Sequence, residues 1–256
     1  MRLGDKLLKL FFWLMMVVIY IPIGVMILFS FNSSRSKTYF EGFSLQYYES
    51  LITNSRIWES FYNSIWVAIV VIVISLALGI LMAFAVTRYR PRGSTLLDSL
   101  IMVPIIIPEI VEAVTLVVFL VVVGIPLSPL TVIIGHVTFD APLAYLIIKA
   151  RLQGWNKEYE EAAMTLGADE ITTFFKVTLP LLMPAILAAA FLTFIWSYDD
   201  FIKTFFTRPT GFETLPVYLW TYLARGRVEL DINALSTLII AIAILFTYFR
   251  MRVVRE

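Results

Sequence analysis

Five carboxylic acids stand inside long apolar runs of this 256-residue sequence: Glu109, Glu112, Asp140, Asp199 and Asp200. An ionisable side chain at the centre of a bilayer costs about 2.5–3.5 kcal/mol, so such residues indicate function by default. The interiors of these runs carry no Lys or Arg apart from Lys203, at one outer edge. An acidic lining with so few bases suits a cation and repels phosphate or sulfate.

Each acid also has a structural interpretation. Glu109 and Glu112, three residues apart on one helix face, could bond a neighbouring helix or a second subunit. Asp200 could pair with Lys203 one turn later. For Asp140 both interpretations stay open, whereas we expect Asp199 to line a path for a cation.

Aromatic residues after the fifth apolar run add a second feature of the same kind. The stretch "TLPVYLWTYLARG" contains Tyr218, Trp220 and Tyr222. Aromatic faces attract ammonium groups, by about 0.5–2 kcal/mol. The alternative is a belt at the membrane–water interface, which we favour for Trp220. Tyr218 and Tyr222 remain candidates for the path.

The elements that must position these residues are membrane helices. Charged residues make up 15% of the chain and the mean hydropathy is +0.86, against about 25% charged residues in soluble domains. Lipid offers the backbone no hydrogen-bond partners, so runs of about 20 apolar residues must be helical. We predict an all-α membrane protein with six transmembrane helices, and a break at Pro104 and Pro108 just before two of the acids. The spans are roughly 10–31, 62–87, 99–123, 130–149, 182–203 and 233–250.

The distribution of Lys and Arg predicts the orientation. Most basic residues fall in segments 2–9, 88–92, 149–176 and 250–255, which the six spans place on one side. The positive-inside rule makes that side the cytosol, with both termini there. The chain is therefore expected to be a multi-pass membrane protein.

A polar segment at about 150–182 interrupts the apolar pattern on the cytosolic side. Strong helix formers run from Glu158 to Leu166, and Gly167 stands where a helix end favours positive φ. Asp169 can cap a second helix, which we expect Leu179-Pro180 to end. An ordinary solvated loop is the alternative. We interpret the two short helices as an element that another protein binds.

The spacing Glu161-Ala162-Ala163, Gly167, Val177, Leu179-Pro180 resembles the EAA signature of ABC importer permeases, with Val177 where that family prefers Ile. The resemblance implies a coupling helix that inserts into a cleft on a cytosolic ATPase. The coupling residues it implies are Glu161, Ala162, Ala163, Gly167, Leu179 and Pro180.

Further stretches extend the resemblance to the spermidine/putrescine (PotC-like) permease family over nearly the whole chain. They are "FNSS", "YRPRG", "PEIVEAVTL", "SYDDF", "TLPVYLW" and "INALST". Glu112 and Asp140 depart from the apolar or small residues expected in this family. The resemblance implies the type I ABC importer permease fold, with residues 1–256 as a single transmembrane permease domain. It also implies a place in a bacterial plasma (inner) membrane and half of a path for a polyamine delivered by a binding protein.

The sequence carries no catalytic chemistry of its own. It has no Gly-x-x-x-x-Gly-Lys-Ser/Thr loop, no cysteine, and a single histidine, His136, which we interpret as structural. We therefore expect no enzyme activity, no catalytic residue and no metal site, and a net charge of +1 gives no sign of a nucleic-acid partner.

The partners that the resemblance implies are an ATPase dimer holding ATP and Mg, a second related permease in a heterodimer, and an extracytoplasmic solute-binding protein. Alternatives are an ABC permease for another cationic or small organic solute, and an ion-gradient-driven carrier or channel subunit. A scaffold without transport is a third, but it leaves the membrane acids unexplained.

Overall fold

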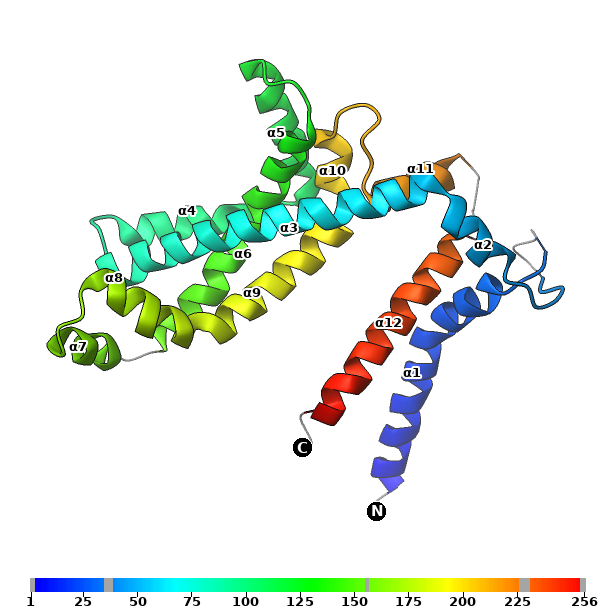
Figure 1. The fold of residues 1–256 in the computed structure, drawn as a ribbon, viewed down its shortest axis with the longest axis horizontal. Helices are drawn as coiled ribbons and strands as arrows, with labels where there is room; N and C mark the ends of the chain where they lie inside the picture. The colour runs from blue at the N-terminus through cyan, green and yellow to red at the C-terminus, as the bar shows by residue number, and fades with distance from the viewer. Residues whose placement is uncertain (1–2, 35–38, 155–156, 226–230, 254–256) are drawn as a thin grey trace. The chain divides into compact units, whose positions relative to one another are not determined.

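The computed structural model describes residues 3–34, 39–154, 157–225 and 231–253, and their regular structure is helical apart from an isolated bridge between Asn32 and Phe43 (Figure 1). The chain forms two compact units, one of residues 59–218 and one of residues 1–58 and 219–256. Each unit is described by itself below.

The unit of residues 1–58 and 219–256 contains α1 (Leu3–Ser30), α2 (Gln46–Thr53) and α12 (Asp231–Val253). Both α1 and α2 pack against α12. Ser50 Oγ on α2 donates a 2.8 Å hydrogen bond to Asp231 Oδ2 at the start of α12. In the loop after α1, the Asn32 side chain donates to the Tyr39 carbonyl and accepts from the Glu41 backbone N–H, both at 3.0 Å. These polar contacts fix the ends of helices whose apolar sides stay exposed for lipid or a partner.

The unit of residues 59–218 is built around α6. Its elements are α3 (Ser55–Phe84, its first turn belonging to the other unit), η1 (Ala85–Tyr89), α4 (Ser94–Ile106), α5 (Glu109–Val123), α6 (Pro129–Gln153), α7 (Glu158–Thr165), α8 (Glu170–Thr173), η2 (Phe174–Thr178), α9 (Leu179–Asp199), α10 (Ile202–Thr207) and the first turn of α11 (Leu215–Ala224).

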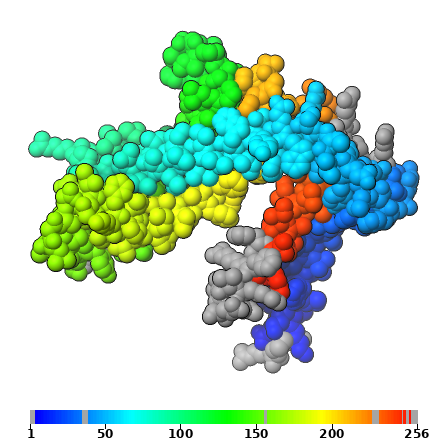
Figure 2. Space-filling model, in the orientation of Figure 1, coloured from blue at the N-terminus to red at the C-terminus, as the bar shows by residue number. Residues whose placement is uncertain are grey.

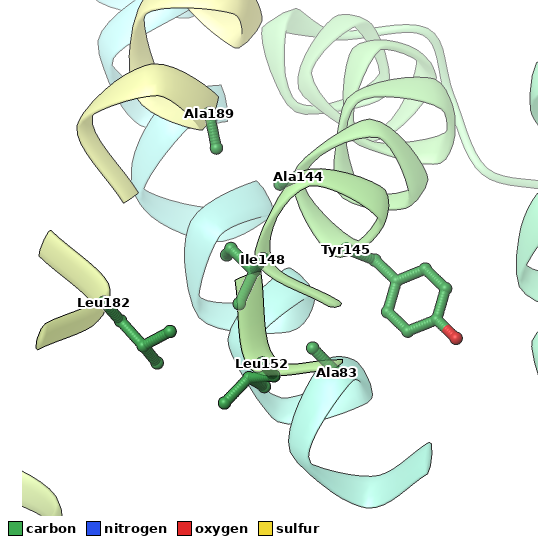
Figure 3. Close-up of a cluster of buried hydrophobic side chains, with 7 residues drawn as sticks. All are labelled: Ala83, Ala144, Tyr145, Ile148, Leu152, Leu182 and Ala189. Atoms are coloured by element: carbon green, nitrogen blue, oxygen red, sulfur yellow. The ribbon is translucent and has the colours of Figure 1, made fainter. Parts of the chain in front are cut away.

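The core of this unit joins three helices. Ala83 of α3, Ala144 and Ile148 of α6, and Leu182 of α9 are all fully buried in one cluster (Figure 3). The small residues let the helix backbones approach, which is the usual way that helices associate where no hydrophobic effect drives them together. The closest approach is at Gly79, where an added Cβ would lie 2.8 Å from Ala144 Cβ and 2.8 Å from the Tyr145 backbone nitrogen.

The predicted break in the third span is confirmed at Pro108, and it is sharper than a kink. α4 and α5 meet at an angle of 104°. Ile107, the residue before Pro108, is extended, with φ −70° and ψ 137°. The proline ring excludes the helical conformation from that residue. Pro104, in contrast, lies inside α4 and does not end it. Glu109 and Glu112 therefore stand in the first turn of a new helix.

Four helical segments among the described residues are long and apolar enough to cross a membrane: 4–30, 55–89, 129–153 and 170–199. The bent pair α4 and α5 adds a fifth if it is one span, and residues 231–245 of α12 form a shorter apolar helix. Five predicted spans thus coincide with single helices or with the bent pair. The helix of the fifth predicted span ends at Asp199, a few residues before the approximate end at Lys203, and α10 begins after a turn. Asp200 causes that turn by accepting a 3.0 Å hydrogen bond from the Thr204 backbone N–H.

We predict that Gly79→Ala lowers the melting temperature of the detergent-solubilised chain. The new methyl group must displace backbone of α6, and overpacking of this kind costs about 1–3 kcal/mol. The matched control is Gly24→Ala in α1, where nothing lies within 4 Å of the added Cβ. That variant gains helix propensity, so its melting temperature stays level or rises. Equal melting temperatures for the two variants would contradict the close α3–α6 approach.

Candidate functional site

The EAA segment, residues 157–178, forms the two short helices that the sequence predicts. Residues 155–156 of the predicted polar segment lie outside the described residues. α7 ends at Thr165, and Gly167 takes a φ of +92°, which only glycine adopts without strain. Asp169 then caps α8 by accepting a 2.8 Å hydrogen bond from the Thr172 backbone N–H. Hydrogen bonds from Thr172 hold the pKa of this exposed carboxyl below its usual value.

Glu160 anchors the EAA segment to the rest of its unit. Its Oε1 accepts from Thr178 Oγ1 at 3.0 Å and lies 3.4 Å from Arg88 Nη2. Arg88 lies at the end of the long α3–η1 helix and Thr178 ends η2, so one carboxylate joins α7 to two long apolar helical segments. Sequence reasoning missed this residue, since three glutamates crowd the first turn and the sequence does not show which of them faces inward.

Glu161 and Ala162 instead lie on the exposed side of α7, and Ala163 is half-buried. Met164 and Leu166 share the exposed surface, and Leu166 is 90% exposed. A small-residue helix face with exposed apolar neighbours is a surface suited to a protein partner. Figure 2 shows the α7–α8 region at the surface of its unit.

The expectation that Leu179-Pro180 ends the second helix is wrong. Residues 170–199 form one continuous helical segment through α8, η2 and α9, with Pro180 in the first turn of α9. Proline lacks an N–H and crowds the preceding turn. The wide π-helical turn of residues 174–178 lies directly before Pro180, and such turns absorb a missing hydrogen bond without ending the helix. Leu179 and Pro180 therefore connect the EAA segment rigidly to a span.

Asp200 belongs to a buried polar network and not to an open surface. Its Oδ2 accepts a 2.6 Å hydrogen bond from Lys203 Nζ, and its Oδ1 lies 3.4 Å from His136 Nε2. His136 is held further by Ser197 and Thr204, each at 2.8 Å. The pairing of Asp200 with Lys203 is the structural contact that the sequence left open, and His136 belongs to the same network.

Lys203, which the sequence places at an outer edge, is buried between two of the membrane acids. The residue is 4% exposed, and its ammonium lies 2.5 Å from Glu109 Oε1 on α5 as well as 2.6 Å from Asp200. The ring of Phe139 lies below it, with the ring centroid 5.0 Å from Nζ. Lys203 thus neutralises part of the acidic lining and fastens α10 to α5.

Glu112 and Asp140 have carboxylate oxygens without a hydrogen-bond partner among the described residues. Asp140 is 2% exposed, and within the described residues its Oδ1 has no hydrogen-bond partner. The oxygens of Glu112 lie near Thr138, but no hydrogen bond of ordinary geometry reaches them in the part of the chain that is described. The charged neighbours of Asp140 include Lys203, Asp200 and Glu112. Buried carboxyl oxygens without a hydrogen-bond partner are costly, and a role for these two acids in a solute path stays a prediction.

Asp199 opens into a cavity of about 510 Å³ together with two of the other acids. The walls are formed by Glu109, Ile195, Trp196, Asp199, Asp200, Phe201 and Ile202. Asp199 is exposed and has no ion-pair partner among the described residues. Carboxylates beside aromatic rings form an environment that binds an alkylammonium group. Sequence reasoning did not single out Trp196 and Phe201, although they flank the acids it chose.

The two tyrosines predicted for the path lie one turn apart on α11 and differ in burial, since Tyr222 is half-buried. Tyr218 is 1% exposed and packs inside the unit of residues 59–218. Tyr222 belongs to the other unit. Within the described ranges, no group of three or more acidic or histidine side chains could hold a metal ion.

Comparison of the fold with solved structures gives two informative matches. A chain of a bacterial ABC transporter involved in the import of the acidic polysaccharide alginate matches with a TM-score of 0.74 and 17% identity, covering 98% of each chain. The MetNI methionine ABC transporter matches with a TM-score of 0.59 and 21% identity, over 83% of this chain and 98% of that one. At these identities the likeness concerns the fold alone, which is that of ABC transporter permeases.

Sequence comparison identifies relatives along most of the chain. The spermidine/putrescine transport system permease protein PotC of Haemophilus influenzae is 32% identical over 96% of this chain and 95% of its own length. The putrescine transport system permease protein PotI of Escherichia coli is 32% identical over 87% of this chain and 81% of its own. Residues 75–256 match the family model of the binding-protein-dependent transport system inner membrane component. This chain belongs to that family.

Proposed function

We propose that this chain is the permease subunit of an ATP-driven importer and forms half of the path for a polyamine such as spermidine or putrescine. The cavity at Asp199 carries the proposal, since its carboxylates and aromatic rings match a chain of ammonium and methylene groups. The relatives named for spermidine and putrescine transport support the same solute class.

The proposed topology has six spans with both termini in the cytosol, in a bacterial inner membrane, and one permease domain made of both compact units. The bent α4–α5 pair would be the third span and α12 the sixth. Basic residues of the α3–α4 connection and the EAA segment then lie together on the cytosolic side, as the positive-inside rule requires.

The proposed partners follow from what this chain does not carry. An ATPase dimer with ATP and Mg would bind the exposed face of α7, and a second related permease would close the path. A binding protein would deliver the solute from outside. ATP-driven closure of the ATPases would move the two EAA segments together, and the permeases would rock between inward-facing and outward-facing states, the usual logic of alternating access.

We predict that Asp199→Asn reduces uptake of labelled putrescine into vesicles holding the assembled importer by about tenfold, a cost comparable to one ammonium–carboxylate contact. Asp199→Glu, which keeps the charge, should restore most of the uptake. The stimulation of ATP hydrolysis by the loaded binding protein should persist in both variants. Unchanged putrescine uptake in Asp199→Asn would remove Asp199 from the path and would favour another small organic solute.

We predict that Glu161→Lys weakens association with the ATPase while the chain still inserts into the membrane. The side chain lies on the exposed face of α7, so its replacement leaves the fold intact and alters the docking surface. The matched control is Glu160→Gln, which loses the Arg88 ion pair on the inner side and should reduce thermal stability instead. Copurification of the ATPase at wild-type levels with Glu161→Lys would refute this role of α7.

We predict that Lys203→Met lowers thermal stability, because Asp200 is left as a buried charge; removing one partner of a buried ion pair costs about 3–5 kcal/mol. Adding Asp200→Asn should recover part of the loss, since asparagine keeps the acceptor for the Thr204 N–H. Thermal unfolding of the two variants and the wild type measures the coupling. A single variant as stable as the wild type would contradict a structural role for Lys203.

A further inference from the structure

A basic pocket of about 350 Å³ lies where the α3–α4 connection meets the end of α6, within the unit of residues 59–218. Four basic side chains and one carboxylate are among its lining residues: Arg88, Arg90, Lys149, Lys157 and Asp98. Its volume falls at the small end of the roughly 300–1,000 Å³ typical of ligand pockets. This site shares no lining residue with the acid cavity, and Lys157 places it beside the start of α7.

The positive charge of this pocket is only partly compensated. Asp98 accepts hydrogen bonds from Lys149 and Tyr145, and Glu160 pairs with Arg88. Arg90 directs its Nε to the Thr87 carbonyl at 3.2 Å, and no carboxylate of the described residues pairs with Arg90 or Lys157. Two cationic side chains thus remain available to an anion.

The first turn of α4 contributes a second favourable feature. Ser94 and Thr95 line the pocket, and within the described residues no side chain caps this helix after Gly93. Uncapped backbone N–H groups at a helix start attract phosphate oxygens. Hydroxyl, N–H and cationic groups around one small pocket form the donor set of a phosphate site.

The same helix then presents apolar side chains to the surroundings. Leu96 is 64% exposed and Leu100 is 56% exposed, directly after the residues that line the pocket. Basic pockets between membrane helices on the cytosolic side commonly bind lipid head groups. We propose that this pocket binds a phosphate-bearing anion, namely the head group of an anionic phospholipid whose acyl chains lie along α4. The leaflet assignment rests on the proposed orientation.

The test uses the full chain purified in detergent and native mass spectrometry with phosphatidylglycerol or phosphatidylcholine of matched acyl chains. The pocket variant is Arg90→Gln with Lys157→Gln. The control is Arg151→Gln with Lys176→Gln, the same charge change at exposed residues that do not line the pocket. We expect wild type and control to retain phosphatidylglycerol over phosphatidylcholine. The pocket variant should bind phosphatidylglycerol at least about tenfold more weakly, as expected from the loss of two cations near a membrane surface.

A second measurement separates the two sources of phosphate. If millimolar inorganic phosphate raises the melting temperature of the wild type but not of the pocket variant, without any preference for phosphatidylglycerol, the phosphate site stands and its ligand is soluble. Equal lipid binding by wild type and pocket variant, or equal loss in the control, overturns the proposal. Solute uptake plays no part in these measurements, so their failure leaves the transport function untouched.

Discussion

The proposed transmission of force from α7 to the membrane helices depends on the two contacts of the Glu160 carboxylate. It accepts from Thr178 at the base of the α8–α9 segment and lies against Arg88 at the end of α3–η1. A force on α7 therefore reaches two membrane helices through one side chain. Because η2 carries the helix through Pro180 without a break, the second connection is a rigid helix rather than a hinge. This arrangement suits the proposed role, in which a separate ATPase binds α7 and drives the movement of the permease.

Lipid imposes the second constraint, since polar groups in hydrocarbon must find partners within the protein. Asp200, Lys203 and His136 meet this requirement by pairing with one another and with hydroxyls on α9 and α10. That network holds the turn at which Asp199 faces the cavity. Asp140 and Glu112 lie close to the same network, and within the described residues Asp140 Oδ1 and both carboxylate oxygens of Glu112 have no hydrogen-bond partner. The fold itself does not set the charge of the solute, because a structural neighbour takes part in importing an acidic polysaccharide.

Local rules of chain geometry made much of the structure predictable. Apolar run length indicated the long helices, Pro108 the break before Glu109, and Gly167 and Asp169 the bend between α7 and α8. Each of these depends on residues within a few positions of one another. The EAA signature is also a local pattern and includes Gly167, which is why the family could be inferred from the sequence.

Contacts between distant residues were not predictable in the same way. Lys203 meets Glu109 across 94 positions because α5 packs on α10, so the sequence placed it at an edge when it is buried. Glu160 differs from Glu161 through its contacts with Arg88, 72 positions earlier, and with Thr178, 18 positions later. The π-helical turn before Pro180 likewise depends on how the EAA segment joins α9.

The most direct test of the central claim is uptake of labelled spermidine into proteoliposomes assembled from defined components. The account predicts ATP-dependent uptake when the chain is reconstituted with its ATPase, second permease and binding protein, and none when any of them is omitted. Uptake by this chain alone, without nucleotide, would contradict the claim that it is half of a path whose energy comes from a neighbouring subunit.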